Sequence, residues 1–337
     1  MESTIHYGSS ATLGQESDPV ADAIALLRPR TEPQPGLHAA EPWAVRFDAF
    51  SHIKIGCVVR GQCWLAVDGH EPLLLREGDF YLLNAPPGHI LASSPSAAPE
   101  PAGRLWTRAS DGVVRIGDEA AETAYVCTAS LWFDEDNAPL LLGVLPLLVH
   151  VPASDPLIHR VAAVTQMLGT EVASRAVGRS LVLDHLAQIL FVQVLRAHIA
   201  QANRPVGWLG ALHDDGIGAA LRAMHSDIAR RWTLEELARI SHLSRSAFAS
   251  SFKRQVGVAP IDYLIQWRMS VARDALRRDT RSISELAHAT GYESESAFST
   301  AFRRVVGCSP RQFRDAAQRA APLHPGDGDQ GLRGDQG

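Results

Sequence analysis

The chain has 337 residues, of which 46% are hydrophobic and 20% are charged. This length exceeds what one ordinary hydrophobic core supports, so we expect two domains, and the composition excludes wholesale disorder. The formal net charge of −5 at first argues against a nucleic-acid partner. Residues 226–315, however, hold 15 Arg and Lys against 10 Asp and Glu, whereas the remainder holds 17 against 27. The basic charge is therefore concentrated near the C-terminus, as in a protein with a DNA-binding domain there.

The N-terminal segment, residues 1–19, is polar and acidic, and we expect it to be flexible. It lacks the basic start and the apolar run of a secretory signal. The longest apolar stretch that we identify, Leu140 to Val151, is interrupted by Gly143 and Pro146 and is shorter than the roughly 20 residues of a membrane span. These features predict a cytoplasmic protein that does not contact a membrane.

Between Val45 and Leu91 short apolar runs alternate with turn signals, which include Gly61 and Asp68-Gly69. Short strands at hairpin spacing predict an antiparallel sandwich or barrel. Strand-like patterning resumes at residues 113–116 and 124–133. We therefore assign residues 20–151 to one β domain.

Four cysteines, Cys57, Cys63, Cys127 and Cys308, are scattered along the chain without CxxC spacing. Neither a disulfide framework nor a zinc site is indicated, and we interpret them as buried reduced thiols. The alternative is a redox pair in which Cys57 and Cys63 face each other across a hairpin.

After Pro152 the apolar spacing becomes helical, and residues 152–202 are predicted to form a helical hairpin. Its apolar faces either pack on the β domain or also join a second subunit. We expect a homodimer, with Leu186 and Leu190 at its contact. Residues 203–214 are interpreted as a linker, and the Gly- and Asp-rich residues 316–337 as a disordered tail.

Residues 215–315 contain an internal repeat. Phe248, Phe252, Gly257 and Pro260 recur at the same offsets fifty positions later. Upstream, Leu237-Ala238 recurs after forty-nine positions, so the second copy has a turn that is one residue longer. Two homologous units, residues 233–257 and 282–307, are therefore present.

Each unit has the pattern of a helix-turn-helix. Thr233 to Glu236 and Ser282 to Glu285 have the capping-box form, with a hydroxyl at the N-cap and a carboxylate three residues later. Polar or Gly turns at 240–243 and 290–293 precede a second helix. For these second helices we predict caps at Ser244 and Ser294, ends at Gly257 and Gly307, and buried stripes of Phe248, Phe252 and Val256, and of Phe298, Phe302 and Val305.

The opposite face of each second helix carries small polar and cationic side chains. Small side chains allow close approach to base edges, and cations can neutralise phosphates. On one isolated helix this pattern would indicate only a solvated face, but its recurrence with matched caps and turns predicts DNA binding. The predicted DNA-binding residues are Arg245, Ser246, Ala249, Ser250, Lys253, Arg254, Ser296, Ser299, Thr300, Arg303 and Arg304.

The segment from Ile217 to Arg314 resembles the DNA-binding domain of the AraC/XylS regulators. The resemblance is carried by LEELA, SRSAFASSFKRQVG-x2-P, YLIQWRM, ISELAHATGYESESAF and FRRVVGCSPRQFR. It implies two helix-turn-helix units, joined by a long helix, that enter successive major-groove segments on one face of double-stranded promoter DNA. The recognition helices would be Arg245 to Val256 and Glu295 to Val305. Glu295 departs from this pattern, because its carboxylate repels phosphate unless it accepts from a cytosine amine.

The N-terminal half resembles, more loosely, the cupin-like sensor domain of one branch of this family. The similarity lies in RFDAFSHIKIGCVVRGQCWLAVDG and REGDFYLLNAPPGH. It implies an effector pocket inside the barrel, for which Trp43, Trp64 and Tyr81 are candidates. The same three residues are equally well interpreted as core or rim residues.

A metal-dependent cupin enzyme would need a His-x-His pair with a carboxylate on neighbouring strands. His52, His70 and His89 are isolated in the sequence, and we interpret each as a surface or turn histidine. We therefore expect no metal, no cofactor and no enzymatic activity.

The predicted fold is α+β, with a cupin-like β-barrel, a helical hairpin and an all-α C-terminal domain with two helix-turn-helix motifs. The predicted function is that of a transcriptional regulator that responds to a small-molecule effector and, if it is an activator, contacts RNA polymerase. One alternative is a cupin enzyme tethered to DNA, against which the missing metal triad argues. Another is an architectural DNA-binding protein, which would not need a large acidic N-terminal half.

Overall fold

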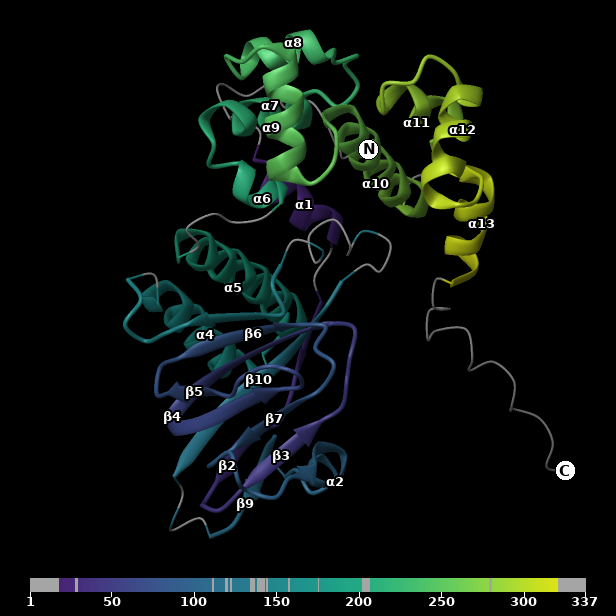
Figure 1. Ribbon diagram of the computed structural model, residues 1–337. Helices are drawn as coiled ribbons and strands as arrows, with labels where there is room; N and C mark the ends of the chain where they lie inside the picture. Colours follow the sequence, from purple (N-terminus) through teal and green to yellow (C-terminus); the bar gives the residue numbers. More distant parts are fainter. Residues whose placement is uncertain are drawn as a thin grey trace, which may run out of the picture. The chain divides into compact units, whose positions relative to one another are not determined.

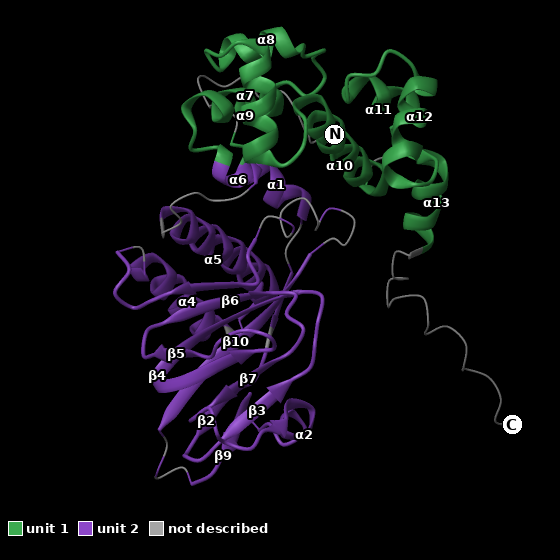
Figure 2. Cartoon of the chain, viewed as in Figure 1, with its two compact units in different colours: residues 1–19, 211–337 green, residues 20–210 purple. Residues whose placement is uncertain are grey.

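Figure 1 shows the computed structural model of the chain, in which the described residues fall within 18–320. Residues 28–29, 111, 119–120, 122, 134–136, 138–142, 144, 157, 175, 202–206 and 279–280 are not described. The described residues form two compact units (Figure 2), an N-terminal unit of residues 20–210 and a C-terminal unit of residues 211–320 with 18 and 19. Of the predicted tails, residues 1–17 and 321–337 lie outside this description, whereas residues 316–320 are helical, so the predicted start of the disordered tail was wrong. In the predicted linker, residues 208–211 form a short helix, α6 (Trp208–Ala211).

The N-terminal unit is built on an eleven-stranded curled sheet. Its central path runs in the order β8-β3-β7-β4-β10-β2-β9, and β1, β5, β6 and β11 pair beside this path. Most neighbours are antiparallel, whereas β2–β9 and β3–β8 are parallel. The strands are β1 (Arg30–Pro33), β2 (Gly36–Ala39), β3 (Ala44–Phe47), β4 (Ile53–Val67), β5 (Leu73–Arg76), β6 (Phe80–Asn84), β7 (His89–Ala92), β8 (Glu100–Pro101), β9 (Val113–Ile116), β10 (Ala124–Trp132) and β11 (Leu148–Val151).

The long strand β4 replaces two of the predicted strands. We expected a turn at Gly61. This was wrong, because β4 is one continuous strand of fifteen residues that includes this glycine. The pairing of β4 with β10 shifts register at Val59, which has no partner on β10, and Gly61, two residues later, has a φ of +76°. Val58 faces the core before this bulge, and Cys63 and Leu65 face the core after it. The bulge therefore changes which alternate residues of β4 point inward.

The course of β4 determines which residues lie opposite Cys57 and Cys63. Cys57 and Cys63 lie on the same strand, so the alternative in which they face each other across a hairpin is wrong. Cys57 instead lies opposite Cys127 of β10, and Cys63 lies opposite Leu75 of β5. Burial raises the pKa of the Cys57 and Cys63 thiols to about 12, which keeps both protonated near neutral pH.

Two antiparallel helices, α4 (Ile158–Ala173) and α5 (Arg179–Gln201), form the predicted hairpin (Figure 1). α5 packs against β1 and β11. Leu186 and Leu190 are 6% and 1% exposed within the unit. They are therefore core residues, and the dimer contact that we predicted through them is wrong. Among the described residues, this unit also contains α2 (Ala102–Trp106) and most of α1 (Pro19–Leu27) and of α6.

The helix α5 is apolar over a greater length than the spacing of its residues predicted. Its residues Arg179–Ala200 are long and apolar enough to cross a membrane by length and composition. In the most apolar window of this helix, 44% of the residues are buried inside the structure. The core helix of a globular protein meets the same criteria, so this feature is weak evidence for a membrane span.

The regular secondary structure in the described part of the C-terminal unit is all α-helical. α8 (Leu234–Ile240) and α9 (Arg245–Val256) form the first helix-turn-helix, and α11 (Ile283–Ala289) and α12 (Glu295–Val306) form the second. The long α10 (Pro260–Arg278) joins them. α7 (Asp215–Ser226) packs on α8 and α9, and α13 (Pro310–Ala320) packs on α10 and α12. The order of strands, helical hairpin and all-α domain confirms the predicted fold class.

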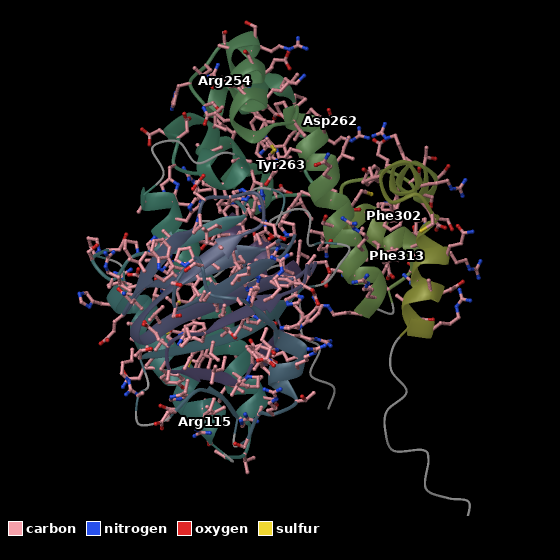
Figure 3. The ribbon with its side chains drawn as sticks, turned by 60° about the horizontal axis from the view of Figure 1, so that its bottom comes forward. Arg115, Arg254, Asp262, Tyr263, Phe302 and Phe313 are labelled. Atoms are coloured by element: carbon pink, nitrogen blue, oxygen red, sulfur yellow. The ribbon has the colours of Figure 1, made fainter. Side chains whose placement is uncertain are left out.

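Phenylalanines hold each second helix in place. Phe248 and Phe252 of α9, and Phe298 and Phe302 of α12, are fully buried. In Figure 3 the labelled Phe302 and Phe313 lie together, and their ring centroids are 5.7 Å apart. The predicted stripe of α12 was wrong at its end, because Val305 is 39% exposed and Val306 packs inward instead. A helix returns to the same face four residues after Phe302, as it does between Phe252 and Val256.

Gly61, two residues after the bulge at Val59, gives a stability prediction. A Cβ at Gly61 would lie 1.9 Å from the backbone oxygen of Thr123, whereas a Cβ at Gly69, which also has a positive φ, would meet nothing within 4 Å. We expect Gly61→Ala to destabilise the N-terminal unit by more than about 3 kcal/mol, and Gly69→Ala by only about 1 kcal/mol. Urea unfolding of both variants measures the two values. Equal losses of stability would contradict this account of the bulge.

Candidate DNA-binding site

The first helix of each helix-turn-helix begins at the predicted capping box. The Thr233 Oγ1 accepts from the Glu236 backbone N–H at 3.2 Å, and the Glu236 carboxylate accepts from the Thr233 N–H at 2.9 Å. Ser282 and Glu285 make the same reciprocal pair at 3.1 and 2.7 Å. The hydrogen bond from the Thr233 backbone, together with Arg230, lowers the pKa of Glu236 to about 2. Both predicted capping boxes are confirmed.

The second helices also begin and end where the sequence predicts. Ser244 accepts from the Ala247 N–H at 3.3 Å, and Ser294 accepts from the Ala297 N–H at 3.2 Å. At the other end, the chain turns into the left-handed region at Gly257 and Gly307, with φ of +94° and +89°. α9 and α12 therefore occupy equivalent segments of the two copies.

All eleven predicted DNA-binding residues are exposed or partly exposed, because the phenylalanines turn the opposite face of each helix inward. On α12 five of them surround a surface hollow of about 390 Å³. Its lining residues are Ser296, Ser299, Thr300, Arg303 and Arg304. The residues at the same offsets on α9 are Ser246, Ala249, Ser250, Lys253 and Arg254.

The cations on these faces differ in their partners. Arg245 pairs with Glu235 of α8 at 3.0 Å, and Arg254 donates to Ser251 at 3.0 Å. The side chains of Lys253 and Arg303 make no hydrogen bond or ion pair with any residue that the structure describes. Exposed ion pairs contribute little to stability, so a phosphate can replace the Glu235 carboxylate at little cost.

The hydroxyls on the two helices also differ. The Thr300 Oγ1 donates to the backbone carbonyl of Ser296 at 2.9 Å. Its proton is thereby used inside the helix, and its lone pairs remain free to accept from a base. The equivalent Ser250 makes no such bond within the described part of the chain. Ser250 can therefore both donate and accept, whereas Thr300 is limited to accepting.

Within the C-terminal unit, a buried arginine that was not predicted from the sequence connects the two helix-turn-helix motifs. Arg268 of α10 is 8% exposed, and it donates to the carbonyls of Ile228 and Arg230, each at 2.7 Å. Its guanidinium carbon also lies 5.7 Å from the ring centroid of Tyr292, in the turn of the second unit. Arg268 thus binds the loop before α8 and contacts the turn before α12. The only sequence signal is an arginine at helical spacing between the buried Leu264 and Ala272 of α10.

Gly291 allows these two segments to approach. Its φ is +81°, and a Cβ there would lie 2.4 Å from the backbone oxygen of Ala229 and 2.6 Å from Nη2 of Arg268. Beside this contact Arg231 and Glu293 form an exposed ion pair at 2.5 Å. The turn of the second helix-turn-helix is therefore packed directly on the loop that precedes the first helix-turn-helix.

Of the three candidate effector-binding residues, two lie in the buried core inside the sheet and one does not. Trp43 and Tyr81 are 3% and 0% exposed and belong to one buried cluster inside the sheet. Trp64 does not belong to it, because Cys63 and Leu65 on either side face that cluster. The Trp43 Nε1 and the Tyr81 hydroxyl find no hydrogen-bond partner among the described residues.

The histidines are less isolated than the sequence indicates. His89 is fully buried rather than at the surface, so our interpretation of it was wrong. It lies 5.8 Å, and His52 4.3 Å, from the ring centroid of Phe50. Loop residue Phe50 brings them together, which a pattern of separated strands does not reveal. Among the described residues no three His, Cys, Asp or Glu side chains are grouped as metal ligands would be.

Two matched helix-turn-helix units with outward polar and cationic faces define the C-terminal unit as a double helix-turn-helix DNA-binding domain. A helix-turn-helix domain profile matches residues 237–316, and a cupin profile matches residues 18–200. The chain is 40% identical over 299 residues to a putative AraC-like transcription regulator of Streptomyces lividans, which covers 88% of this chain and 98% of the relative. The chain belongs to the family of AraC-like transcription regulators, and both family resemblances seen in the sequence are confirmed.

Two further proteins illustrate the similarity. AlkR of Acinetobacter baylyi, an HTH-type transcriptional regulator, is 34% identical over 205 residues, which is 60% of this chain and 66% of AlkR. The DNA-binding domain of AdpA, solved in complex with a target DNA, is 29% identical to the region it matches, with a TM-score of 0.31. That match covers 32% of this chain and 97% of the AdpA domain.

The contact at Gly291 gives a prediction with a matched control. We expect Gly291→Ala to weaken DNA binding at least tenfold, or about 1.4 kcal/mol, because the added methyl group separates the two helix-turn-helix motifs. Gly307→Ala also places alanine at a positive φ but meets nothing within 4 Å, so we expect it to change affinity less than about threefold. Fluorescence anisotropy on a DNA site selected from a random library measures both. Equal effects would mean that the contact does not position the second unit.

Proposed function

We propose that this AraC-type regulator binds promoter DNA in a sequence-specific manner and changes promoter activity when its N-terminal unit binds a small effector. It acts in the cytoplasm as a homodimer, and where it activates transcription it contacts RNA polymerase. The observation that carries the DNA-binding part is the equivalence of α9 and α12. At five equivalent offsets their outward faces carry small side chains and cations, which on α12 surround a hollow, whereas Arg245 of α9 corresponds to Glu295 of α12.

Two kinds of contact divide this face. Lys253 and Arg303 hold equivalent positions, and their long cationic side chains reach phosphate oxygens at the edge of the groove. Ser250 and Thr300 are uncharged, short and exposed, and they lie one turn earlier on the same face. These hydroxyls approach the base edges in the major groove. The first pair supplies affinity for any DNA, and the second pair supplies sequence preference.

The two roles can be measured separately. We expect Lys253→Ala or Arg303→Ala to weaken binding to all sequences alike and to make the log-log salt dependence shallower by about one unit. Ser250→Ala or Thr300→Ala should leave the salt dependence unchanged and alter the preferred base at one position by roughly 1 kcal/mol or more. Binding to a randomised DNA library and to a fixed random duplex, at several salt concentrations, gives both quantities.

Arg104→Ala serves as the control, because Arg104 is an exposed arginine of α2 in the N-terminal unit. It should change neither the salt dependence nor the base preference. If the serine and threonine variants keep the original base preference while the lysine and arginine variants change it, the two roles are assigned to the wrong residues.

The dimer requires a different surface from the one predicted by sequence. α5 exposes a stripe of large apolar side chains, with Leu181 at 62%, Val182 at 40% and Ile189 at 46%. Val182 and Ile189 are seven residues apart and so lie on one face of the helix, and Leu181 lies at the edge of that face beside Val182. Exposed apolar stripes of this kind mark interaction sites, and a second copy of α5 presents a matching stripe under two-fold symmetry.

The stripe gives a prediction that separates association from folding. We expect Leu181→Glu with Ile189→Glu to convert the dimer into a folded monomer, because charges would be buried at the contact. Leu186→Glu should instead unfold the N-terminal unit, since Leu186 is a core residue. Sedimentation gives the mass, and circular dichroism reports the fold. A wild-type chain that sediments as a monomer at micromolar concentration would overturn the dimer.

A further inference from the structure

Lys54, at the start of β4, is one of only two lysines in the chain. It is 5% exposed, whereas the other, Lys253, lies exposed on α9. The Lys54 Nζ lies 4.0 Å from the ring centroid of Phe47 and 5.9 Å from that of Phe50. No carboxylate in the described part of the chain forms an ion pair with it. Buried charges in proteins are normally paired, and the attraction to one or two rings replaces only part of a counter-ion.

The groups closest to Lys54 are basic and aromatic, and one carboxylate lies at the rim, where Glu32 accepts from the Trp132 Nε1 at 3.0 Å. His89 is fully buried and stacks on Phe47 at 4.5 Å, and neither of its ring nitrogens has a hydrogen-bond partner among the described residues. His52 stacks on Phe50 at 4.3 Å and lies 4.0 Å from the ring of Trp132. Buried polar atoms without partners call for a bound water, ion or ligand.

The register of the sheet places this group at one end of the half-barrel. Lys54 lies opposite Leu83 of β6 and Ser130 of β10, so the three side chains share one face. Leu83 belongs to the interior cluster, and Lys54 therefore faces the interior too. Two residues towards the end of the sheet, His52 and the 43% exposed Trp132 form the rim. Lys54 thus lies one step below an aromatic rim, in a position that ligands commonly occupy in barrels.

We propose that this mouth of the half-barrel binds a small organic monocarboxylate with a planar apolar body. The carboxylate pairs with the Lys54 ammonium, and the body stacks on the rim rings of Phe50, His52 and Trp132. A single carboxylate supplies one negative charge to one uncompensated cation, and a planar body matches rings that already stack on one another. The site rests on the proposed function, since it names the chemical class of the effector.

The chemistry of Lys54 gives this site a direct signal. Burial lowers the pKa of Lys54 to about 8, so a substantial part of its population is an unprotonated, nucleophilic amine at pH 8. A carboxylate bound at the ammonium favours the charged form, and it also blocks access to the nitrogen. Ligand binding therefore lowers the rate at which Lys54 is acylated. Lys253, on the other unit, is an internal reference.

The test uses the full-length wild-type protein. Trace labelling with acetic anhydride at pH 8, followed by digestion and mass spectrometry, measures acetylation of Lys54 relative to Lys253 with benzoate or benzamide as the probe. We expect saturating benzoate to lower the ratio at least fivefold and the neutral benzamide to leave it unchanged. An unchanged ratio with benzoate, or equal protection by both probes, would overturn the proposal.

A variant gives an independent measurement. Lys54→Met keeps the length of the side chain and removes its charge, and replacement of an unpaired buried charge by an apolar group does not destabilise a core. Benzoate should raise the Tm of the wild type and of Lys253→Met, and should not raise that of Lys54→Met. A benzoate shift that survives in Lys54→Met would place the carboxylate elsewhere and refute the site.

The site and the proposed function can fail separately. If benzoate protects Lys54 but leaves DNA affinity and promoter activity unchanged, the binding site stands and its coupling to DNA is refuted. If benzoate gives no protection and an uncharged effector changes promoter activity, the proposed function stands and the carboxylate site is refuted.

Discussion

The arrangement of the two helix-turn-helix units depends on one buried guanidinium. Arg268 extends from the long helix α10 and donates to the loop carbonyls of Ile228 and Arg230, of which the second also accepts from the Trp232 backbone N–H. Arginine suits this position because its planar fork can serve two acceptors at once and still lie beside Tyr292. A lysine would offer a single point of charge. The spacing of the recognition helices is therefore set by contacts inside one compact unit, and two otherwise repeated modules present themselves to DNA as a single body.

The sequence predicted those parts of the fold that are determined by interactions between residues close together in the chain. Capping boxes and terminal glycines act over four residues or fewer, so the ends of α8, α9, α11 and α12 could be located from local patterns. The bulge at Val59 could not, because the nearby Gly61, between two apolar runs, is compatible both with a turn and with a continuous strand. The partner strand β10 decides between them, and its pairing with β4 spans more than sixty residues of sequence.

The same distinction applies to the sites. The outward faces of α9 and α12 followed from the phenylalanine spacing, and the one error in a buried stripe, Val305, arose from choosing a three-residue step where the helix required four. Lys54 and Arg268 had no such signal, since a single cation in a sequence indicates solvent in most cases. Only their placement opposite buried neighbours, in a sheet register or on a helix stripe, distinguishes them from surface residues.

The scarcity of lysine has a consequence for how this surface can be modified. The cations of the outward faces are arginines except for Lys253, and guanidinium groups keep their charge at any pH that a folded protein tolerates. The positive charge of α12 is thus fixed. Enzymes or metabolites that acylate lysine have one target on α9 and none on α12. Two helices that match in length, caps and buried side chains therefore differ in chemical susceptibility, and acylation would weaken electrostatic attraction at one of them alone.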